Sequence, residues 1–375
     1  MTDTARAKRT SPTSAVARRG AKTKKSPASA TVDRERLVQF YRDMILIRRF
    51  EERTARSYTE ALIGGYCHLN LGEEAAVVGL MSALRESDYL FTNYREHGYA
   101  LLRGIDPDRV MAELYGRVDG VSKGWGGSMH MFDLSHRLLG GYGIVGGQLP
   151  LATGAALAID YRGSNEIVMC TMGDGTANVG AFHESLNIAA LWNLPIAFVI
   201  INNGLGMGTT VDKASSEPEL YKRGAAYRIA SERVDGFDPV LVASAASRAV
   251  ETARTAKPFL LEVMTERLRG HSVVDPAKYR SAEETLALKV HDPLVTYAAR
   301  LVREGVLTEK DLARFDEEAT HRATEAHVFA EASAQPDVST LFDYNYATPV
   351  ANDSHRLPGQ PLFEPAPRTT ARRQP

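Results

Sequence analysis

The chain has 375 residues, of which 44% are hydrophobic and 24% are charged, and its formal net charge at pH 7 is −1. These values are ordinary for a globular protein that buries a sizeable core. No stretch has the apolar length of a membrane span and no secretory apolar core is present, so we expect neither a membrane partner nor a disulfide framework for the two cysteines, Cys67 and Cys170.

The first 31 residues differ in charge from the rest of the chain. They carry eight Lys or Arg and one Asp, a net charge of +7, which leaves −8 for the remainder. Because large apolar residues are scarce there, we expect a disordered basic tail. It lacks the amphipathic pattern of a transit peptide, which favours a cytoplasmic bacterial protein over a protein of the mitochondrial matrix. No aromatic residues are interleaved with the positive charges, so we do not expect nucleic-acid binding.

Apolar periodicity predicts the following elements in chain order: helices over 33–60, 73–85 and 147–160, a strand over 166–172, a helix over 181–192, strands over 195–201 and 259–264, and helical structure within 293–332. Asp33 is a candidate cap for the first helix. Strands that alternate with helices predict an α/β fold with a mostly parallel sheet flanked by helices, with additional helices at both ends. Residues 335–375 contain seven prolines, so we expect one large domain over 32–332 and an extended tail over 333–375.

Two polar motifs follow two of these predicted strands. Gly173-Asp174-Gly175 comes after the first, and Asn202-Asn203 comes after the second, with Asn203 lying 29 positions beyond Asp174. The carboxyl ends of parallel strands share one edge of a sheet, which is where ligands bind in open α/β folds. Carboxylate and amide oxygens suit Mg²⁺, and glycines allow the backbone to approach a phosphate. Gly-Asp-Gly alone is more often a plain turn, but the strand, helix and strand between the two motifs favour a metal and diphosphate site.

Five further blocks carry a family resemblance. With the two motifs above, they resemble the thiamine-diphosphate-dependent 2-oxo acid dehydrogenases, in the form of the alpha subunit of the first component of pyruvate dehydrogenase complexes. The resemblance extends from about residue 37 to about residue 332. The blocks are Tyr94-Arg-Glu-His-Gly98, Lys123-Gly-Trp-Gly-Gly-Ser-Met-His-Met131, Gly140-Gly-Tyr-Gly-Ile-Val-Gly146, Gly204-Leu-Gly-Met-Gly-Thr209 and Arg269-Gly-His-Ser272.

The resemblance implies a set of cofactor and metal positions. Mg²⁺ would be bound by the side chains of Asp174 and Asn203 and by the main-chain oxygen of Leu205. The family usually has tyrosine where Leu205 stands. Because the implied ligand is the main-chain oxygen, leucine leaves it in place. Thiamine diphosphate would contact the residues that match the family's cofactor positions, which are Tyr94, Arg95, Gly143, Val145, Asp174, Gly175, Thr176, Asn203 and His271.

Two histidines match positions beside the reacting groups in this family. His68 and His271 would stabilise charge or relay protons, since an imidazole titrates nearest to neutrality. Each alone would more often be a structural histidine, and the surrounding motifs favour the catalytic role. His97 and His130 are expected to orient or pack. The family often has histidine where Arg269 stands, and Ser272 matches a serine that is phosphorylated in mitochondrial relatives.

The resemblance also implies partners that complete the chemistry. The cofactor acts as the electron sink for decarboxylation of a 2-oxo acid, and the acyl group passes to a lipoyl group of an acyltransferase component. The glutamate that activates the cofactor resides on a separate beta subunit in this family, so we expect an α2β2 heterotetramer. Pyruvate is the favoured substrate, with acetoin dehydrogenase or branched-chain 2-oxo acid dehydrogenase alpha subunits as alternatives, and a non-catalytic homologue as a weaker one. A nicotinamide-binding fold is disfavoured because its glycine fingerprint is absent.

Overall fold

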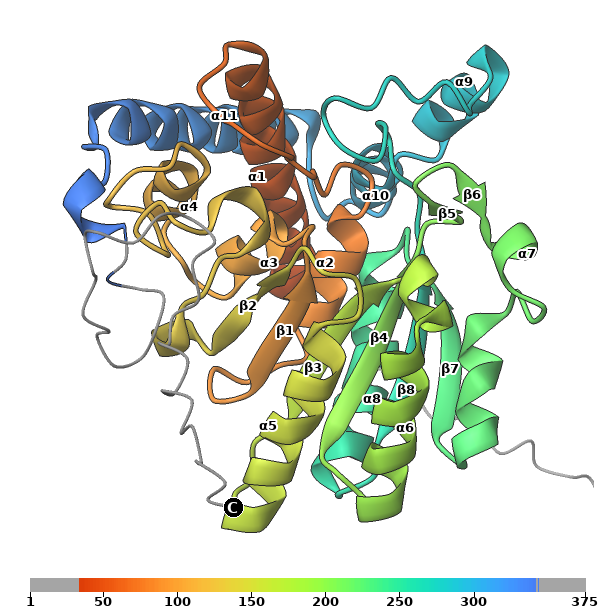
Figure 1. Cartoon of the computed structure of the whole chain (residues 1–375). Coiled ribbons are helices and arrows are strands. Elements are labelled where there is room, and N and C mark those ends of the chain that lie inside the picture. Colours follow the sequence, from red (N-terminus) through yellow and green to blue (C-terminus); the bar gives the residue numbers. More distant parts are fainter. Residues whose placement is uncertain (1–33, 342, 344–375) are drawn as a thin grey trace, which may run out of the picture. The chain divides into compact units, whose positions relative to one another are not determined.

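The structure is a computed structural model that describes residues 34–341 and 343. Its centre is a sheet of six strands in the order β2-β1-β3-β4-β8-β7, in which every neighbouring pair is parallel (Figure 1). The strands are β1 (Tyr89–Asn93), β2 (Leu138–Tyr142), β3 (Val168–Gly173), β4 (Ile196–Asn202), β7 (Ala230–Asp235) and β8 (Phe259–Met264), and a two-stranded antiparallel ribbon joins β5 (Leu205–Gly206) to β6 (Thr209–Thr210). The predicted α/β fold with a parallel sheet is confirmed.

Eleven α-helices connect or flank the strands within the described residues. They are α1 (Arg34–Thr59), α2 (Glu74–Met81), α3 (His97–Leu102), α4 (Pro107–Leu114), α5 (Gln148–Arg162), α6 (Gly180–Trp192), α7 (Val211–Ala214), α8 (Pro239–Arg254), α9 (Ala282–Val290), α10 (Pro293–Arg303) and α11 (Glu309–Ala332). None of these helices is long and apolar enough to span a membrane.

The central strands bury both faces, as their continuous apolar sequences predict. Alternate residues of a strand point to opposite faces, so β4 divides its side chains between two cores. Ile196, Phe198 and Ile200 pack with α5 and α6. Ala197 and Val199 pack on the other side, in the core that includes α1, α2 and α8. Figure 1 shows α5 and α6 lying across the front of the strands. Helices on both faces leave the strand ends as the exposed edge of the sheet.

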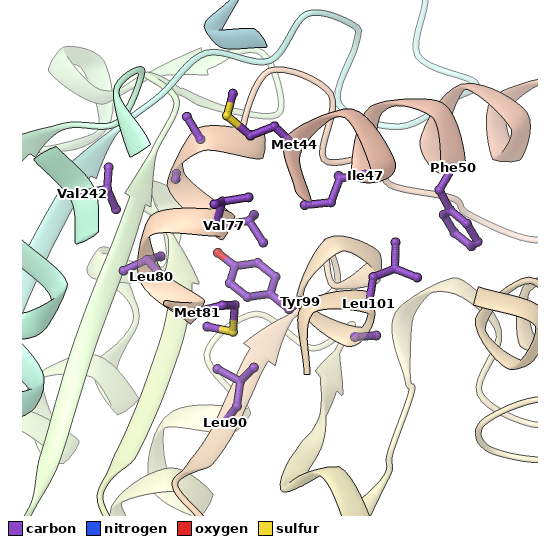
Figure 2. Packing of buried hydrophobic residues seen from close by; sticks show 14 of the residues in the cluster. Met44, Ile47, Phe50, Val77, Leu80, Met81, Leu90, Tyr99, Leu101 and Val242 are labelled. Atoms are coloured by element: carbon purple, nitrogen blue, oxygen red, sulfur yellow. The ribbon is translucent and has the colours of Figure 1, made fainter. Parts of the chain in front are cut away.

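The larger core fixes the start of α2 and α3, two helices that border the site described below. Tyr99 of α3 is 2% exposed and lies between the apolar side chains of α1 and α2 (Figure 2). Val77 and Leu80 of α2 and Met44 of α1 have no exposed area in the same cluster. Burial on this scale stabilises each large side chain by roughly 1.5–3 kcal/mol, so these helices form a rigid frame.

A buried ion network adds directional contacts to this frame. Arg48 of α1 donates from Nε to Glu74 at 2.6 Å, and its two terminal nitrogens donate to the carboxylate of Asp292 at 2.8 and 2.9 Å. Glu74 is fully buried and also accepts a bond from the backbone N–H of Gly72 at 2.9 Å. The network ties α1, the first turn of α2 and the start of α10 together.

Most predicted elements are present, with two corrections. The helix expected over 73–85 ends at Met81, because the chain turns at Ser82, whose hydroxyl donates to the carbonyl of Gly79 at 2.8 Å. The helical region of 293–332 is two helices, interrupted at Gly305, which has φ +69°. Both cysteines are buried and free, as expected. The Asp33 cap, the basic tail over 1–31 and nearly all of the proline-rich tail beyond Leu341 lie outside the described residues.

Candidate active site

The two motifs meet where neighbouring strands end. β3 and β4 pair in parallel with Gly173 opposite Ile201, so Asp174 and Asn203 leave the sheet side by side at its carboxyl edge. A cavity of about 260 Å³ opens there. The predicted positions Tyr94, Arg95, Val145, Asp174, Gly175, Thr176, Asn203, Leu205 and His271 all line it, together with Glu73, Asn93, Gly173, Ile201, Gly206, Met207 and Arg267. Residues from six separate stretches of the chain are thereby brought to one place.

The carboxyl group of Asp174 is buried, which makes its ionised form unfavourable. Asp174 is 6% exposed, and burial raises the pKa of its carboxyl group to about 6, although the N–H of Gly175 and the charge of Arg267 oppose the rise. The nearby carboxylate of Glu73 raises the pKa of Asp174 further. A buried acid with a raised pKa gains stability when a cation neutralises it. Asp174 is therefore suited to bind a metal ion.

The adjacent asparagines have different roles. Asn202 is structural, because its Nδ2 donates to the buried carboxylate of Glu262 at 2.6 Å and its Oδ1 accepts from the N–H of Gly204 at 2.9 Å. Asn203 donates from Nδ2 to Glu73 at 3.1 Å, while its Oδ1 is buried with no hydrogen-bond partner. Leaving a buried acceptor unsatisfied costs free energy. A cation beside Asp174 would satisfy this oxygen, so the donor set fits a hard divalent metal.

Two buried guanidinium groups make the cavity suitable for an anion. Arg95 is 5% exposed, and its terminal nitrogens donate to the backbone oxygens of Leu69 at 2.5 Å and His271 at 2.9 Å. Arg267 is 2% exposed, with its Nε buried and unpartnered, and burial and the charge of Arg95 lower its pKa. The nearest acid to Arg95 is Glu73, at 3.8 Å. The carboxylates of Glu73 and Asp174 line the same cavity and balance these two charges, so a divalent cation bound at Asp174 would leave a positive excess that favours a multiply charged anion such as a diphosphate.

The two predicted catalytic histidines lie against each other and against Tyr94. The ring centroids of His68 and His271 are 5.0 Å apart, and those of His68 and Tyr94 are 4.4 Å apart. Burial and the positive charge of Arg95 lower the pKa of His68 to about 2 and that of His271 to about 4. Both imidazoles are therefore neutral at pH 7 in this structure.

The tautomer of His271 follows from a single contact. Arg267 donates from Nη1 to Nδ1 of His271 at 2.8 Å, so Nδ1 is an acceptor and the ring proton is on Nε2. The backbone N–H of His271 donates to Asp275 at 2.7 Å, which fixes the loop around it. His271 can thus offer a hydrogen-bond donor at Nε2.

One family of known proteins matches most of this chain. The family model of the dehydrogenase E1 component matches residues 42–339. The chain belongs to this family. Membership of the E1 family implies thiamine diphosphate as the cofactor. The site fits this cofactor, because it contains two buried guanidinium groups and the unpartnered Oδ1 of Asn203.

Individual relatives of this E1 chain share most of its length. A protein of Rhizobium meliloti, named pyruvate dehydrogenase E1 component subunit alpha, is 45% identical over 324 residues, which cover 85% of this chain and 93% of the relative. A protein of the same name from Zymomonas mobilis is 47% identical over 319 residues, covering 84% and 90%. A chloroplastic subunit alpha-3 from Oryza sativa is 38% identical, covering 87% of this chain and 80% of the relative.

Two predicted positions lie beside the cavity lining. His68 does not line the cavity but contacts His271 and Tyr94, which do. Gly143 is also absent from the lining; its N–H donates to Nε2 of His130 at 3.3 Å. Its neighbour Val145 lines the cavity and is 48% exposed. The cofactor contact expected for Gly143 stays a prediction.

Sequence reasoning missed the two charged residues among the unpredicted lining of the E1 cavity, Glu73 and Arg267. Glu73 precedes α2 and is 3% exposed, and it accepts bonds from Asn203 and, at 3.4 Å, from Asn70. No sequence motif includes Glu73, because its hydrogen-bond partner Asn203 lies 130 positions further along the chain. Arg267 was missed as well, although a detectable signal existed: it follows the predicted strand β8 and so lies at the same carboxyl edge as Asp174.

Proposed function

We propose that this chain is the alpha subunit of a pyruvate dehydrogenase (acetyl-transferring) first component. It would catalyse, with a separate beta subunit, the oxidative decarboxylation of pyruvate and the transfer of the acetyl group to a lipoyl group of an acyltransferase component. The observation that carries the proposal is the convergence of Asp174, Asn203, Arg95 and His271 on one cavity, in a chain whose relatives over 84–85% of its length are named for this activity.

Mg²⁺ would be bound by Asp174, by Asn203 and by the main-chain oxygen of Leu205. The raised pKa of Asp174 and the unpartnered Oδ1 of Asn203 support this set. Among the described residues, no cluster of three or more His, Cys, Asp or Glu could hold a metal on its own. Of the three proposed ligands, only Asp174 belongs to these residue types. A metal bound here would therefore complete its coordination with diphosphate oxygens and water.

The protein residues would bind, orient and exchange protons around the cofactor, which itself supplies the electron sink for decarboxylation. Arg95, with Thr176 and the backbone of Gly175, would face the diphosphate. Neutral His271 would donate from Nε2 to a carbonyl or carboxylate oxygen of the substrate. His68, held neutral by its burial and by Arg95, would offer hydrogen bonds beside the reacting groups without adding charge to the cavity.

The rim of the cavity supports a partner that covers it. Around the loops that carry Val145, Met207 and His271, exposed apolar side chains gather: Tyr66 at 64%, Ile144 at 79%, Val145 at 48%, Met207 at 66% and Val274 at 55% exposure. Apolar groups exposed beside a buried charged site are typical of a surface that another subunit covers. The beta subunit of an α2β2 heterotetramer is the proposed cover, and it would bring the activating glutamate that the family places there.

The substrate is tested by turnover of the assembled enzyme. We expect the chain, co-purified with its beta subunit, to give a higher kcat/KM for pyruvate than for 2-oxoisovalerate or acetoin, measured by reduction of an artificial electron acceptor. Faster turnover of either alternative substrate would replace pyruvate in the proposal. Binding of thiamine diphosphate with no turnover of any of the three would favour a non-catalytic homologue.

The remaining assignments concern organisation and location. We place the dehydrogenase domain at residues 32–332, between a basic segment over 1–31 and a proline-rich segment over 333–375. The bacterial relatives support a cytoplasmic protein. Phosphorylation of Ser272, which is 8% exposed, would put about two negative charges beside the cavity.

A further inference from the structure

Glu113 of α4 binds one loop through four backbone hydrogen bonds. Its Oε1 accepts from the N–H groups of Gly126 at 2.7 Å and Gly127 at 3.0 Å, and its Oε2 accepts from Ser122 at 2.7 Å and Gly124 at 2.8 Å. The side chain has no exposed area and does not line the cavity. A carboxylate with four charge-assisted bonds to one segment fixes the path of that segment.

These bonds explain Gly126 of the Lys123–Met131 motif, to which the family resemblance gave no role. A Cβ on Gly126 would lie 2.0 Å from the backbone oxygen of His130. A Cβ on Gly120, at the entry to the loop, would lie 2.7 Å from Cα of Glu113. Only a chain without side chains at these points can bring its N–H groups onto one carboxylate.

Ser128, within the same loop, contacts the segment that carries His68. Ser128 Oγ lies 2.9 Å from Nε2 of His97 and accepts a bond from the backbone N–H of His68 at 3.4 Å. His97 is held in turn, because its Nδ1 lies 2.9 Å from the carboxylate of Glu51. Glu51 also accepts from the backbone N–H of Asn70 at 2.8 Å, so the segment that carries His68 is fixed on both sides.

The same loop reaches the predicted cofactor position at Gly143. His130, two residues beyond Ser128, accepts the bond from the N–H of Gly143 at 3.3 Å. Met131 then donates from its backbone to the buried carboxylate of Glu96 at 2.8 Å, which ends the loop. One loop therefore supports both a predicted catalytic residue and a predicted cofactor contact.

We propose that Glu113 is a positioning residue of this active site, which acts through the loop Ser122–Met131. Its carboxylate fixes the backbone of the loop. The contact of Ser128 with the backbone of His68 then fixes the position of His68, and the contact of His130 with the N–H of Gly143 fixes that of Gly143. The roles of His68 and Gly143 rest on the function proposed above, whereas the mechanical coupling between the loop and these segments does not.

The test is Glu113→Gln in the assembled alpha and beta complex. Glutamine keeps the size of the side chain but replaces one accepting oxygen by a donor, which opposes two of the four N–H groups. A displacement of about 1 Å at a reacting group can lower turnover about a hundredfold, so we expect kcat at saturating cofactor to fall by about that factor. Hydrogen exchange should rise in residues 122–131 and also in residues 67–71.

Asp88→Asn is the matched control. Asp88 is also a buried carboxylate that accepts two backbone bonds, from Arg85 at 2.9 Å and Ile167 at 3.0 Å, but it precedes β1, at the opposite edge of the sheet. We expect Asp88→Asn to lower the melting temperature at least as much as Glu113→Gln while kcat stays within about threefold of wild type. A loss of kcat in both variants alike would show a general effect of destabilisation and overturn the proposal.

Ser128→Ala tests the route from Glu113 to His68. If the route is correct, the two substitutions are non-additive: the double variant loses little more kcat than Glu113→Gln alone. Full multiplication of the two effects, or a folded Glu113→Gln complex with wild-type kcat, would overturn it. If Glu113→Gln does not assemble, Ser128→Ala alone decides, since wild-type kcat in that variant contradicts the route. Should the wild-type complex turn over no 2-oxo acid, the proposed function fails, and the exchange of residues 67–71 still tests the coupling.

Discussion

Replacing Asp174 by alanine is expected to reduce the affinity of the assembled enzyme for thiamine diphosphate with Mg²⁺ by more than about a hundredfold. Loss of a group that only orients a metal ligand costs 10- to 100-fold in affinity, so loss of a ligand itself should cost at least that much. Isothermal titration calorimetry on the alpha and beta complex measures the effect. Asp160→Ala, at an exposed position near the end of α5, is the control and should bind as wild type does. Unchanged affinity in Asp174→Ala would remove the basis of the metal assignment.

The pKa of Asp174 adds a pH dependence with a defined sign. Its pKa in the folded protein is about 6, above the ordinary value of 3.8, so the stability that this group contributes is fully present below pH 3.8 and is lost as pH rises through 6. Metal binding needs the ionised form, so affinity for Mg²⁺ should rise up to about pH 6 and level off above it. The cofactor-free Asp174→Asn complex should melt at the wild-type temperature or higher at pH 7.5. A lower melting temperature would show that the carboxylate stabilises the fold without any cation.

Replacing His271 by alanine is expected to lower kcat by about a hundredfold or more, within the range for loss of a positioned acid or base. Affinity for thiamine diphosphate should stay within about threefold of wild type, because Arg95 bonds to the backbone oxygen of His271, which alanine retains. Steady-state kinetics and calorimetry on the same preparation separate the two effects. His321→Ala, in the exposed part of α11, is the control.

A parallel loss of turnover and affinity in His271→Ala would assign the side chain a different role. In that case the bond from Arg267 to Nδ1 would serve mainly to hold the loop that follows β8. The pKa of His271, about 4, also predicts that titration of this group does not change kcat between pH 6 and 8. A titration near pH 6.5 that disappears in the alanine variant would contradict this.

The sequence was sufficient for the part of the site that depends on strand ends. Asp174 and Asn203 follow two continuous apolar strands, and parallel pairing places them side by side. Glu73 was not predictable in this way, because it reaches the cavity from the start of a helix, and its contact to Asn203 depends on how α2 packs. The distinction between Asn202 and Asn203 also needed the structure, since it depends on the buried carboxylate of Glu262.

Three strands of the sheet were not predicted, for reasons that their positions explain. β7 lies at one edge and has the sequence Ala-Ser-Glu-Arg-Val-Asp, in which every residue is at least partly exposed, so no apolar run marks it. β2 lies at the other edge and contains two glycines. β1 is an interior strand of only five residues, too short to give a clear periodicity. Sheet edges and short strands depend on tertiary pairing more than on local pattern.

We infer that this chain carries half of an active site. The apolar rim around Val145 and Met207 supports a site shared with the proposed beta subunit. The direct measurement compares pyruvate decarboxylation by the chain purified alone with that by the chain purified with its beta subunit, at equal concentrations and with saturating Mg²⁺ and thiamine diphosphate. We predict turnover only in the presence of the beta subunit. Comparable turnover by the isolated chain would contradict the account.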